Sequence, residues 1–193
     1  MIQSKQKIAG GFVAISMAML TGGCAHHSMT DSAVATASLV DAQGQDRGTA
    51  TIIRKAGSLT MTLDATGIPA GKHGIHLHQV GKCEGPAFTS AGPHWNPAGR
   101  KHGLANNAGP HAGDFANIEA TGSGKVTTTF ALDTMELTGG TGSLLDTDGA
   151  AILIHAKPDD NMTDPSGNSG DRIICGVISL VRGSLRHFFD VGH

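Results

Sequence analysis

The sequence predicts an all-β domain, an antiparallel β-barrel or sandwich built from short strands. Three observations predict this fold: segments in which apolar residues alternate with threonine, 28 glycines spread among turns, and no convincing amphipathic helix. Such alternation is typical of half-buried antiparallel strands. Many short strands joined by glycine-rich turns favour a sandwich or barrel. The single tryptophan and the lack of tyrosine indicate a mainly aliphatic core.

Eight segments carry the strand pattern. In chain order they are residues 33–41, 48–54, 58–64, 74–80, 116–120, 125–132, 150–154 and 172–181. The second and third contain the runs Thr-Ala-Thr-Ile-Ile and Leu-Thr-Met-Thr-Leu, which alternate clearly. Two connections, residues 81–115 and 157–171, are too long to be simple turns. Long irregular loops in a compact domain usually carry function, so we expect the site there.

The first 23 residues are predicted to be an export signal. Lys5 and Lys7 precede a mostly apolar run over residues 8–20, the layout of a secretory signal peptide that is too short to span a bilayer comfortably. We therefore expect export to the periplasm or cell envelope. Residues 24–32 are predicted to be a flexible linker, and the C-terminal extension, residues 182–193, has no predicted role.

The segment ending at Cys24 resembles the cleavage box of bacterial lipoproteins, although Thr21 stands where leucine is usual. Lipidation of Cys24 would anchor the protein to a membrane. The alternative is ordinary signal cleavage nearby, for example after Ala25, which would discard Cys24.

Residues 33–181 are expected to form one domain, because a chain of this length can bury a sizeable core. A net charge of −2 without a basic run makes nucleic acid an unexpected partner. Cys83 and Cys175 are an even pair in an exported chain, for which a disulfide is the default expectation. The alternative is two buried free thiols.

Seven of the eleven histidines lie between His73 and His155. Imidazole is the commonest protein ligand for copper and zinc. His76 and His78, two apart on a predicted strand, would point to the same face about 6.6 Å apart. With His155, at the end of another apolar strand, they suit copper. His102, His111 and Asp114 lie in the first long loop, and two imidazoles, a carboxylate and one further ligand suit a closed tetrahedral zinc site.

Five motifs together resemble the copper/zinc superoxide dismutase family, in particular its bacterial periplasmic type. They are HGIHLHQVGKC at 73–83, GPHWNP at 92–97, RKHG at 100–103, HAGD at 111–114 and GNSGDRIICGVI at 167–178. The resemblance runs from about residue 33 to residue 180, with every motif in family order. It implies an eight-stranded Greek-key barrel or sandwich, immunoglobulin-like, with two long active-site loops. It also implies one copper and one zinc ion per chain and the conversion of superoxide to O₂ and H₂O₂.

The resemblance also implies a role for each site residue. Copper would be bound by His76, His78, His94 and His155, and zinc by His94, His102, His111 and Asp114. His94 would bridge both metals and supply a proton, while Arg172 would attract and dock superoxide. Asp159 would link His76 to His102, Cys83 and Cys175 would form the family disulfide, and His73 would be structural.

A second hypothesis is a copper- or zinc-binding protein on the same scaffold without turnover. The complete ligand set, together with Arg172 and Asp159, argues against it. Family members exist as monomers and as dimers, so the resemblance leaves a homodimer open.

Overall fold

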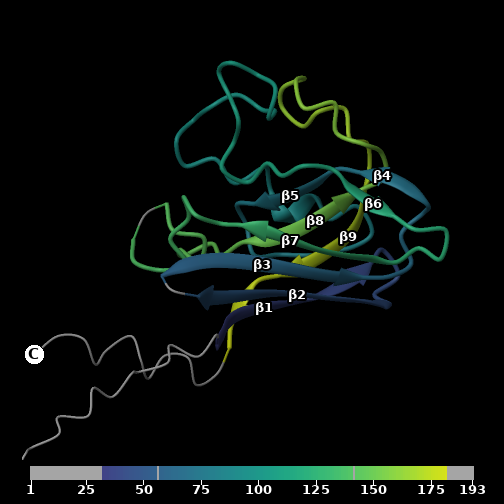
Figure 1. Ribbon diagram of the computed structural model, residues 1–193, viewed down its shortest axis with the longest axis horizontal. Coiled ribbons are helices and arrows are strands. Elements are labelled where there is room, and N and C mark those ends of the chain that lie inside the picture. Colours follow the sequence, from purple (N-terminus) through teal and green to yellow (C-terminus); the bar gives the residue numbers. More distant parts are fainter. Residues whose placement is uncertain (1–31, 56, 141, 182–193) are drawn as a thin grey trace, which may run out of the picture.

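The computed structural model describes residues 32–55, 57–140 and 142–181, with side chains from Val34 onward (Figure 1). The predicted export signal over residues 1–23, the lipidation candidate Cys24, residues 24–31 of the linker and the extension over residues 182–193 lie outside this part. Within it, no helix is long and apolar enough to cross a membrane.

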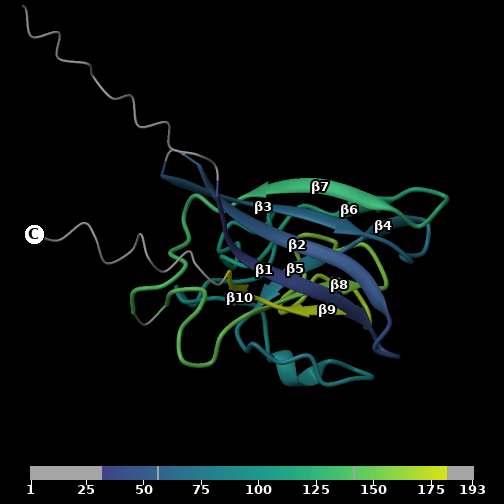
Figure 2. The same ribbon diagram turned by 90° about the horizontal axis from the view of Figure 1, so that it is seen from below.

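Eight strands form one curled antiparallel sheet in the order β5-β8-β9-β1-β2-β3-β7, with β10 paired to β1 (Figure 1). These strands are β1 Ser32–Asp41, β2 Asp46–Lys55, β3 Ser58–Ala65, β5 Ile75–His78, β7 Val126–Ala131, β8 Ala151–His155, β9 Arg172–Val177 and β10 Ser179–Leu180. β4 (Gly71–His73) and β6 (Ile118–Ala120) form a separate pair. The described chain has one helical turn, the 3₁₀ segment η1 over Thr89–Ala91. Figure 2 shows β7, β3, β2 and β1 side by side as a continuous curved layer.

The predicted all-β antiparallel fold is confirmed, but two predicted strands differ in extent. The strand expected over 74–80 is shorter, because only Ile75–His78 pairs with β8, and the residues just before it, Gly71–His73, form the additional strand β4, which pairs with β6. The segment 172–181 breaks at Ile178, whose N–H donates to the carbonyl of Ala150. These differences depend on long-range pairing that alternation along the chain does not report.

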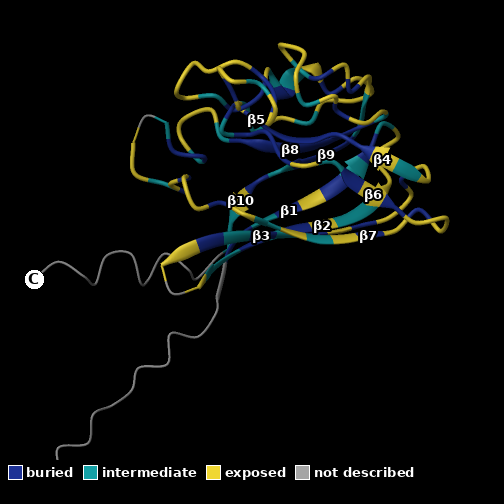
Figure 3. Ribbon diagram, turned by 45° about the horizontal axis from the view of Figure 1, so that its top comes forward, coloured by how far each residue is buried: buried dark blue, intermediate teal, exposed yellow. Residues whose placement is uncertain are grey.

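The core is aliphatic, as predicted, and lies inside the curled sheet. Leu39, Ile52 and Leu63 are buried from three neighbouring strands. β8 differs because all five of its residues are buried (Figure 3). Ile152 and Ile154 face this core, while Ala151 and Leu153 pack with Phe88 and Ala91 of the first long loop. The loop therefore covers the outer face of β8, and this covered face carries the site.

A third long connection, between β7 and β8, was not singled out from the sequence. The described residues between Leu132 and Ala150, which are all but residue 141, contain no strand, yet Leu132, Leu137 and Leu144 are buried in the main core. The spacing of these three leucines matches neither a strand nor a helix. The sequence therefore gives no periodic signal that this segment is part of the core.

Candidate metal centre

β5 positions two histidines by simple alternation. Ile75 and Leu77 belong to the main core, so His76 and His78 project from the opposite face of the strand. Antiparallel pairing sets His76 opposite Leu153 and His78 opposite Ala151. The strand period predicted from the sequence is therefore the reason that these two imidazoles share a face.

The first long loop runs back along β5 and adds two more polar side chains. Trp95 N–H donates to the carbonyl of Leu77 at 2.8 Å, and Leu77 N–H donates to the carbonyl of Gly113 at 2.9 Å. These contacts place His94 beside His78 and Asp114 beside His76. A side chain at Gly113 would start 2.5 Å from the Leu77 carbonyl oxygen, so only glycine permits this approach.

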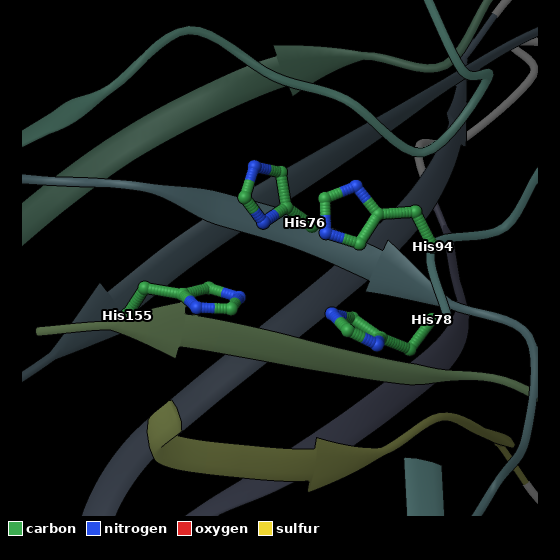
Figure 4. Close-up of side chains that lie close together, drawn as sticks. All are labelled: His76, His78, His94 and His155. Atoms are coloured by element: carbon green, nitrogen blue, oxygen red, sulfur yellow. The ribbon is translucent and has the colours of Figure 1, made fainter. Parts of the chain in front are cut away.

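Four buried histidines meet at this face: His76, His78, His94 and His155, here called the four-histidine group. Figure 4 shows their rings directed toward one another, and one possible ligand atom from each lies within 4.8 Å of the others. Each ring has one buried nitrogen without a hydrogen-bond partner, namely His76 Nδ1, His78 Nε2, His94 Nε2 and His155 Nε2. Buried polar atoms are rarely left unpaired, so four in one place fit a metal ion.

The remaining nitrogens of three of these rings are held by acceptors. His78 Nδ1 lies 2.8 Å from the Gly92 carbonyl, and His155 Nδ1 lies 3.1 Å from the Gly170 carbonyl. His76 Nε2 lies 2.7 Å from the carboxylate of Asp159. Each acceptor takes a ring N–H and thereby leaves the opposite nitrogen as a lone-pair donor.

A second group shares His94 with the first: His94, His102, His111 and Asp114, here called the mixed group. Asp114 Oδ1 lies 2.8 Å from His94 Nδ1 and 3.3 Å from His111 Nδ1. Asp114 Oδ2 lies 3.1 Å from His102 Nδ1, which has no hydrogen-bond partner. The Nδ1 atoms of His94 and His111 are 3.4 Å apart. Ligands on a tetrahedral zinc ion are about 3.3 Å apart, since the bonds are about 2.0–2.1 Å, so these donors have suitable spacing.

Proximity alone also gathers His76 with His94, His102 and Asp114, within 4.8 Å of one another. That limit exceeds the separation of two ligands on one tetrahedral ion. The shorter contacts of His111 with His94 and Asp114 favour His111 as the fourth member of the mixed group.

Asp159 joins the two groups from behind. Its carboxylate lies 2.7 Å from His76 Nε2 and 3.0 Å from His102 Nε2. Asn117 holds the backbone of Asp159 in turn, because its amide donates to the Asp159 carbonyl and accepts the Asp159 N–H, both at 2.8 Å. The sequence pointed to Asp159 but not to Asn117, which no local pattern separates from other loop asparagines.

Burial keeps the four-histidine group uncharged at neutral pH. Desolvation lowers the pKa of His94 to about 4 and that of His155 to about 3. Desolvation also lowers the pKa of His76, and it lowers that of His78 well below the ordinary value. Neutral imidazole is the form that binds a single metal ion, so His76, His78 and His155 need not lose a proton first, whereas His94 must lose its ring proton to bind two ions.

His102 is the exception. Burial lowers its pKa, but contacts with the carboxylates of Asp114 and Asp159 outweigh burial and raise the pKa to about 9. Burial likewise raises the pKa of both carboxyls, yet the close contacts with the His102 ring bring each pKa well below its ordinary range. Without metal, His102 is therefore an imidazolium that lies between the carboxylates of Asp114 and Asp159.

Zinc binding to the metal-free protein is expected to release about one proton per ion at pH 7.5. His102 is protonated at this pH because its pKa is about 9, and its Nδ1 proton must leave before that atom can bind zinc. Release should fall to about half a proton at pH 9, where half of the rings are already neutral. Calorimetry in buffers of different ionisation enthalpy measures the number, and release that does not decrease between these pH values would contradict the assignment.

Arg172 opens β9 beside the four-histidine group and is partly buried. Its guanidinium donates to the carbonyls of Phe88 at 2.7 Å and Gly92 at 2.8 Å. The same Gly92 oxygen faces His78 Nδ1, so one carbonyl connects the arginine to the histidine group. The sequence did not indicate this shared acceptor.

The Cys83–Cys175 disulfide is present, with the two Cα atoms 5.7 Å apart, which excludes the alternative of two free thiols. It attaches the loop containing Phe88 and Gly92 to β9. His73 has no unpartnered ring nitrogen: Nδ1 lies 2.8 Å from the His155 carbonyl and Nε2 lies 2.8 Å from the Pro69 carbonyl. His73 therefore packs behind the site, as expected for a structural residue.

A curled antiparallel barrel with two adjoining buried ligand groups that share one histidine defines a dinuclear metalloprotein. The sequence profile described as copper/zinc superoxide dismutase (SODC) matches residues 46–178, and the chain belongs to this family. Superoxide dismutase [Cu-Zn] 2 of Aquifex aeolicus is 40% identical over 153 residues, covering 78% of this chain and 90% of the relative.

Two further similarities are to proteins named only as dismutase-like. The superoxide dismutase-like protein YojM of Bacillus subtilis is 44% identical over 111 residues, which are 57% of each chain. The crystal structure of a SOD-like protein from Bacillus subtilis superposes with a TM-score of 0.70 at 37% identity, covering 74% of this chain and 96% of that one. Copper and zinc are accordingly the metals that the two ligand groups fit.

Proposed function

We propose that the protein is a superoxide dismutase that converts superoxide to O₂ and H₂O₂. The observation that carries the proposal is the pair of ligand groups joined through His94, in which five buried ring nitrogens lack a hydrogen-bond partner. Bound copper would supply the redox chemistry by alternating between Cu(II) and Cu(I), while zinc is redox-silent. His76, His78, His94 and His155 would hold copper, and His94, His102, His111 and Asp114 would hold zinc.

The chain itself would bind the anion and manage its protons. Arg172 would attract and dock superoxide, because its fixed guanidinium lies beside the copper-binding histidines. His94 would give a proton to the peroxide product, because it is the one histidine that belongs to both ligand groups. Asp159 would keep His76 and His102 in the tautomers that bind metal.

The direct test is purified protein loaded with metal. We expect one copper and one zinc per chain and catalytic consumption of superoxide. A second candidate is a copper- or zinc-binding protein without turnover, favoured by the similarity to a protein titled superoxide dismutase-like. Full metal content without superoxide consumption would establish that candidate instead.

Arg172→Ala is expected to lower the dismutation rate about 10-fold, because electrostatic attraction into a focused site raises encounter rates by at least this factor. Copper and zinc content should not change, since Arg172 is not among the grouped ligands. Stopped-flow measurement of superoxide decay over a range of ionic strength checks this, and the variant should lose much of the salt dependence.

Two variants separate docking from general charge. Arg172→Lys should retain an intermediate rate, because it keeps the charge but loses the paired N–H groups. Lys72→Ala removes the same charge from an exposed position on β4 and should leave the rate within about 2-fold of wild type. An unchanged rate in Arg172→Ala would remove the docking role.

We also propose that the enzyme acts in the periplasm or cell envelope, where it would remove superoxide. The support is the export-signal pattern of residues 1–23 and the lipoprotein-like segment before Cys24. Mass spectrometry of the mature N-terminus decides between a protein lipidated at Cys24 and one cleaved by ordinary signal peptidase. A lipid-modified Cys24 would establish anchoring, and an unmodified terminus beyond Cys24 would exclude it.

A further inference from the structure

The carboxylate of Asp164 touches the mixed group from outside, across the gap between the two long loops. Its Oδ1 accepts the backbone N–H of His102 at 2.8 Å, and its Oδ2 lies 2.9 Å from Nζ of Lys101. The same Oδ1 lies 3.9 Å from Nε2 of His111. One side chain from the loop between β8 and β9 therefore faces two histidines of the loop between β5 and β6.

The distal nitrogens explain why this position matters. His102 and His111 both turn Nδ1 toward the mixed group, so a bound ion would leave the ring proton of each on Nε2. Histidines that bind metals almost always donate this proton to a carboxylate, carbonyl or water. His102 donates it to Asp159. For His111, the carboxylate of Asp164 lies 3.9 Å from Nε2, which is close enough for an electrostatic contact but longer than a hydrogen bond.

Asp164 is held where it is by its own loop. The carboxylate of Asp160 accepts the N–H groups of Met162 and Thr163 at 2.9 and 2.8 Å, and Gly167 N–H donates to the Thr163 carbonyl at 2.7 Å. These contacts fix the turn that presents Asp164 to the opposite loop.

The two loops also contact directly through their backbones. Ala105 N–H donates to the Asn161 carbonyl at 2.9 Å. At Gly103, with φ +109°, a Cβ would lie 2.3 Å from the same carbonyl oxygen, so a larger residue would force the loops apart. The position of Asp164 beside His102 and His111 is therefore built into the contact between the loops.

We propose that Asp164 is a positioning residue of the zinc site, which orients His111 through its Nε2 proton and His102 through its backbone N–H. The backbone N–H of His102 and the ammonium of Lys101 lower the pKa of Asp164, so the group is ionised at neutral pH. The inference rests on the zinc role proposed above for the mixed group. A plain surface ion pair with Lys101 is the rival explanation, and substitution of Lys101 isolates it.

Zinc affinity is the first measurement, by competition with a chromophoric chelator on protein freed of metal. Asp164→Ala should weaken zinc about 10- to 100-fold, the usual consequence of losing a partner of a metal-binding histidine. Asp164→Asn should be intermediate, since an amide oxygen still accepts the His102 N–H but carries no charge. Lys101→Met, and Glu119→Gln as a matched control at the exposed position of β6, should stay within about 2-fold.

The second measurement reports orientation rather than stability. With Co²⁺ in place of zinc, NMR resolves the exchangeable imidazole protons of the bound histidines. In Asp164→Asn the Nε2 proton of His111 should shift and exchange faster with water, while that of His102, held by Asp159, should not change. Circular dichroism checks that this nearly isosteric variant folds, so the test does not depend on Asp164→Ala alone.

Each outcome is decisive. Wild-type zinc affinity in both Asp164 variants, or an unchanged His111 proton in Asp164→Asn, would overturn the inference and leave the proposed zinc site standing. Equal losses in Lys101→Met and Asp164→Asn would also overturn it, because the ion pair would then explain the effect. No zinc binding by wild-type protein would overturn both the zinc role and this inference.

Discussion

His94→Ala is expected to weaken both metal sites at once and to lower dismutation about 10²- to 10⁴-fold, the range that proton transfer by a positioned side chain contributes. His94 is shared because its Nε2 is unpartnered among the four histidines, while its Nδ1 lies 2.8 Å from Asp114 and 3.4 Å from His111. Alanine leaves three donors in each group. Metal content, affinity for each ion and superoxide decay are the measurements.

Two other substitutions make this prediction specific. His155→Ala should weaken copper and spare zinc, and His111→Ala should weaken zinc and spare copper, because each belongs to one group. Spin coupling gives an independent readout. With Cu²⁺ and Co²⁺ both bound, an imidazolate between them would couple their spins and suppress the copper EPR signal, and the signal should reappear in a His94→Ala variant that still holds both ions. A His94→Ala variant that loses one metal and keeps the other at wild-type affinity would contradict the bridge.

Breaking the Cys83–Cys175 disulfide is expected to reduce the free energy of unfolding by about 4.6 kcal/mol, as the chain-entropy relation gives for a loop of this length. The disulfide joins two cysteines 92 positions apart in the sequence and links the first long loop covalently to β9. Urea unfolding of metal-free protein, oxidised against Cys83→Ala/Cys175→Ala, measures the difference. A loss below about 1 kcal/mol would show that the noncovalent contacts suffice to hold the loop.

The same substitution should also lower the rate of the metal-loaded enzyme. The bridged loop supplies the Phe88 and Gly92 carbonyls that hold the guanidinium of Arg172. Without the bridge Arg172 has more freedom, and the docking of superoxide should become less precise. Wild-type protein reduced at its disulfide should behave as the double alanine variant, which controls for effects of the alanines themselves.

Much of the sheet could be predicted because alternation is a local signal. The expected segments 33–41, 48–54 and 58–64 correspond closely to β1, β2 and β3, where one face is buried and the other exposed. The separate strand β4 just before β5 and the break at Ile178 could not be predicted, since both follow from partners far away along the chain. The connection from Leu132 to Ala150 was missed because its buried leucines follow no period.

The metal centre divides in the same way. His76 and His78 share a face by strand alternation, and the ordered motifs include His94, His102, His111 and Asp114. His155 was expected from its place at the end of an apolar strand. Asn117, the Gly92 carbonyl and Asp164 were not indicated. Each of them forms hydrogen bonds with residues 14 to 80 positions away in the sequence, and such contacts produce no spacing pattern along the chain.

The sequence by itself determined that this is an all-β protein with a copper- and zinc-type ligand set, because residue type and short-range spacing are properties of the chain. Only the tertiary structure decided which ring nitrogen is left for a metal, since that depends on the acceptor facing the opposite nitrogen, as Asp159 faces His76 and Gly170 faces His155. Only the fold brought Asp164 to His102 and His111, because two loops must first meet for one carboxylate to reach both.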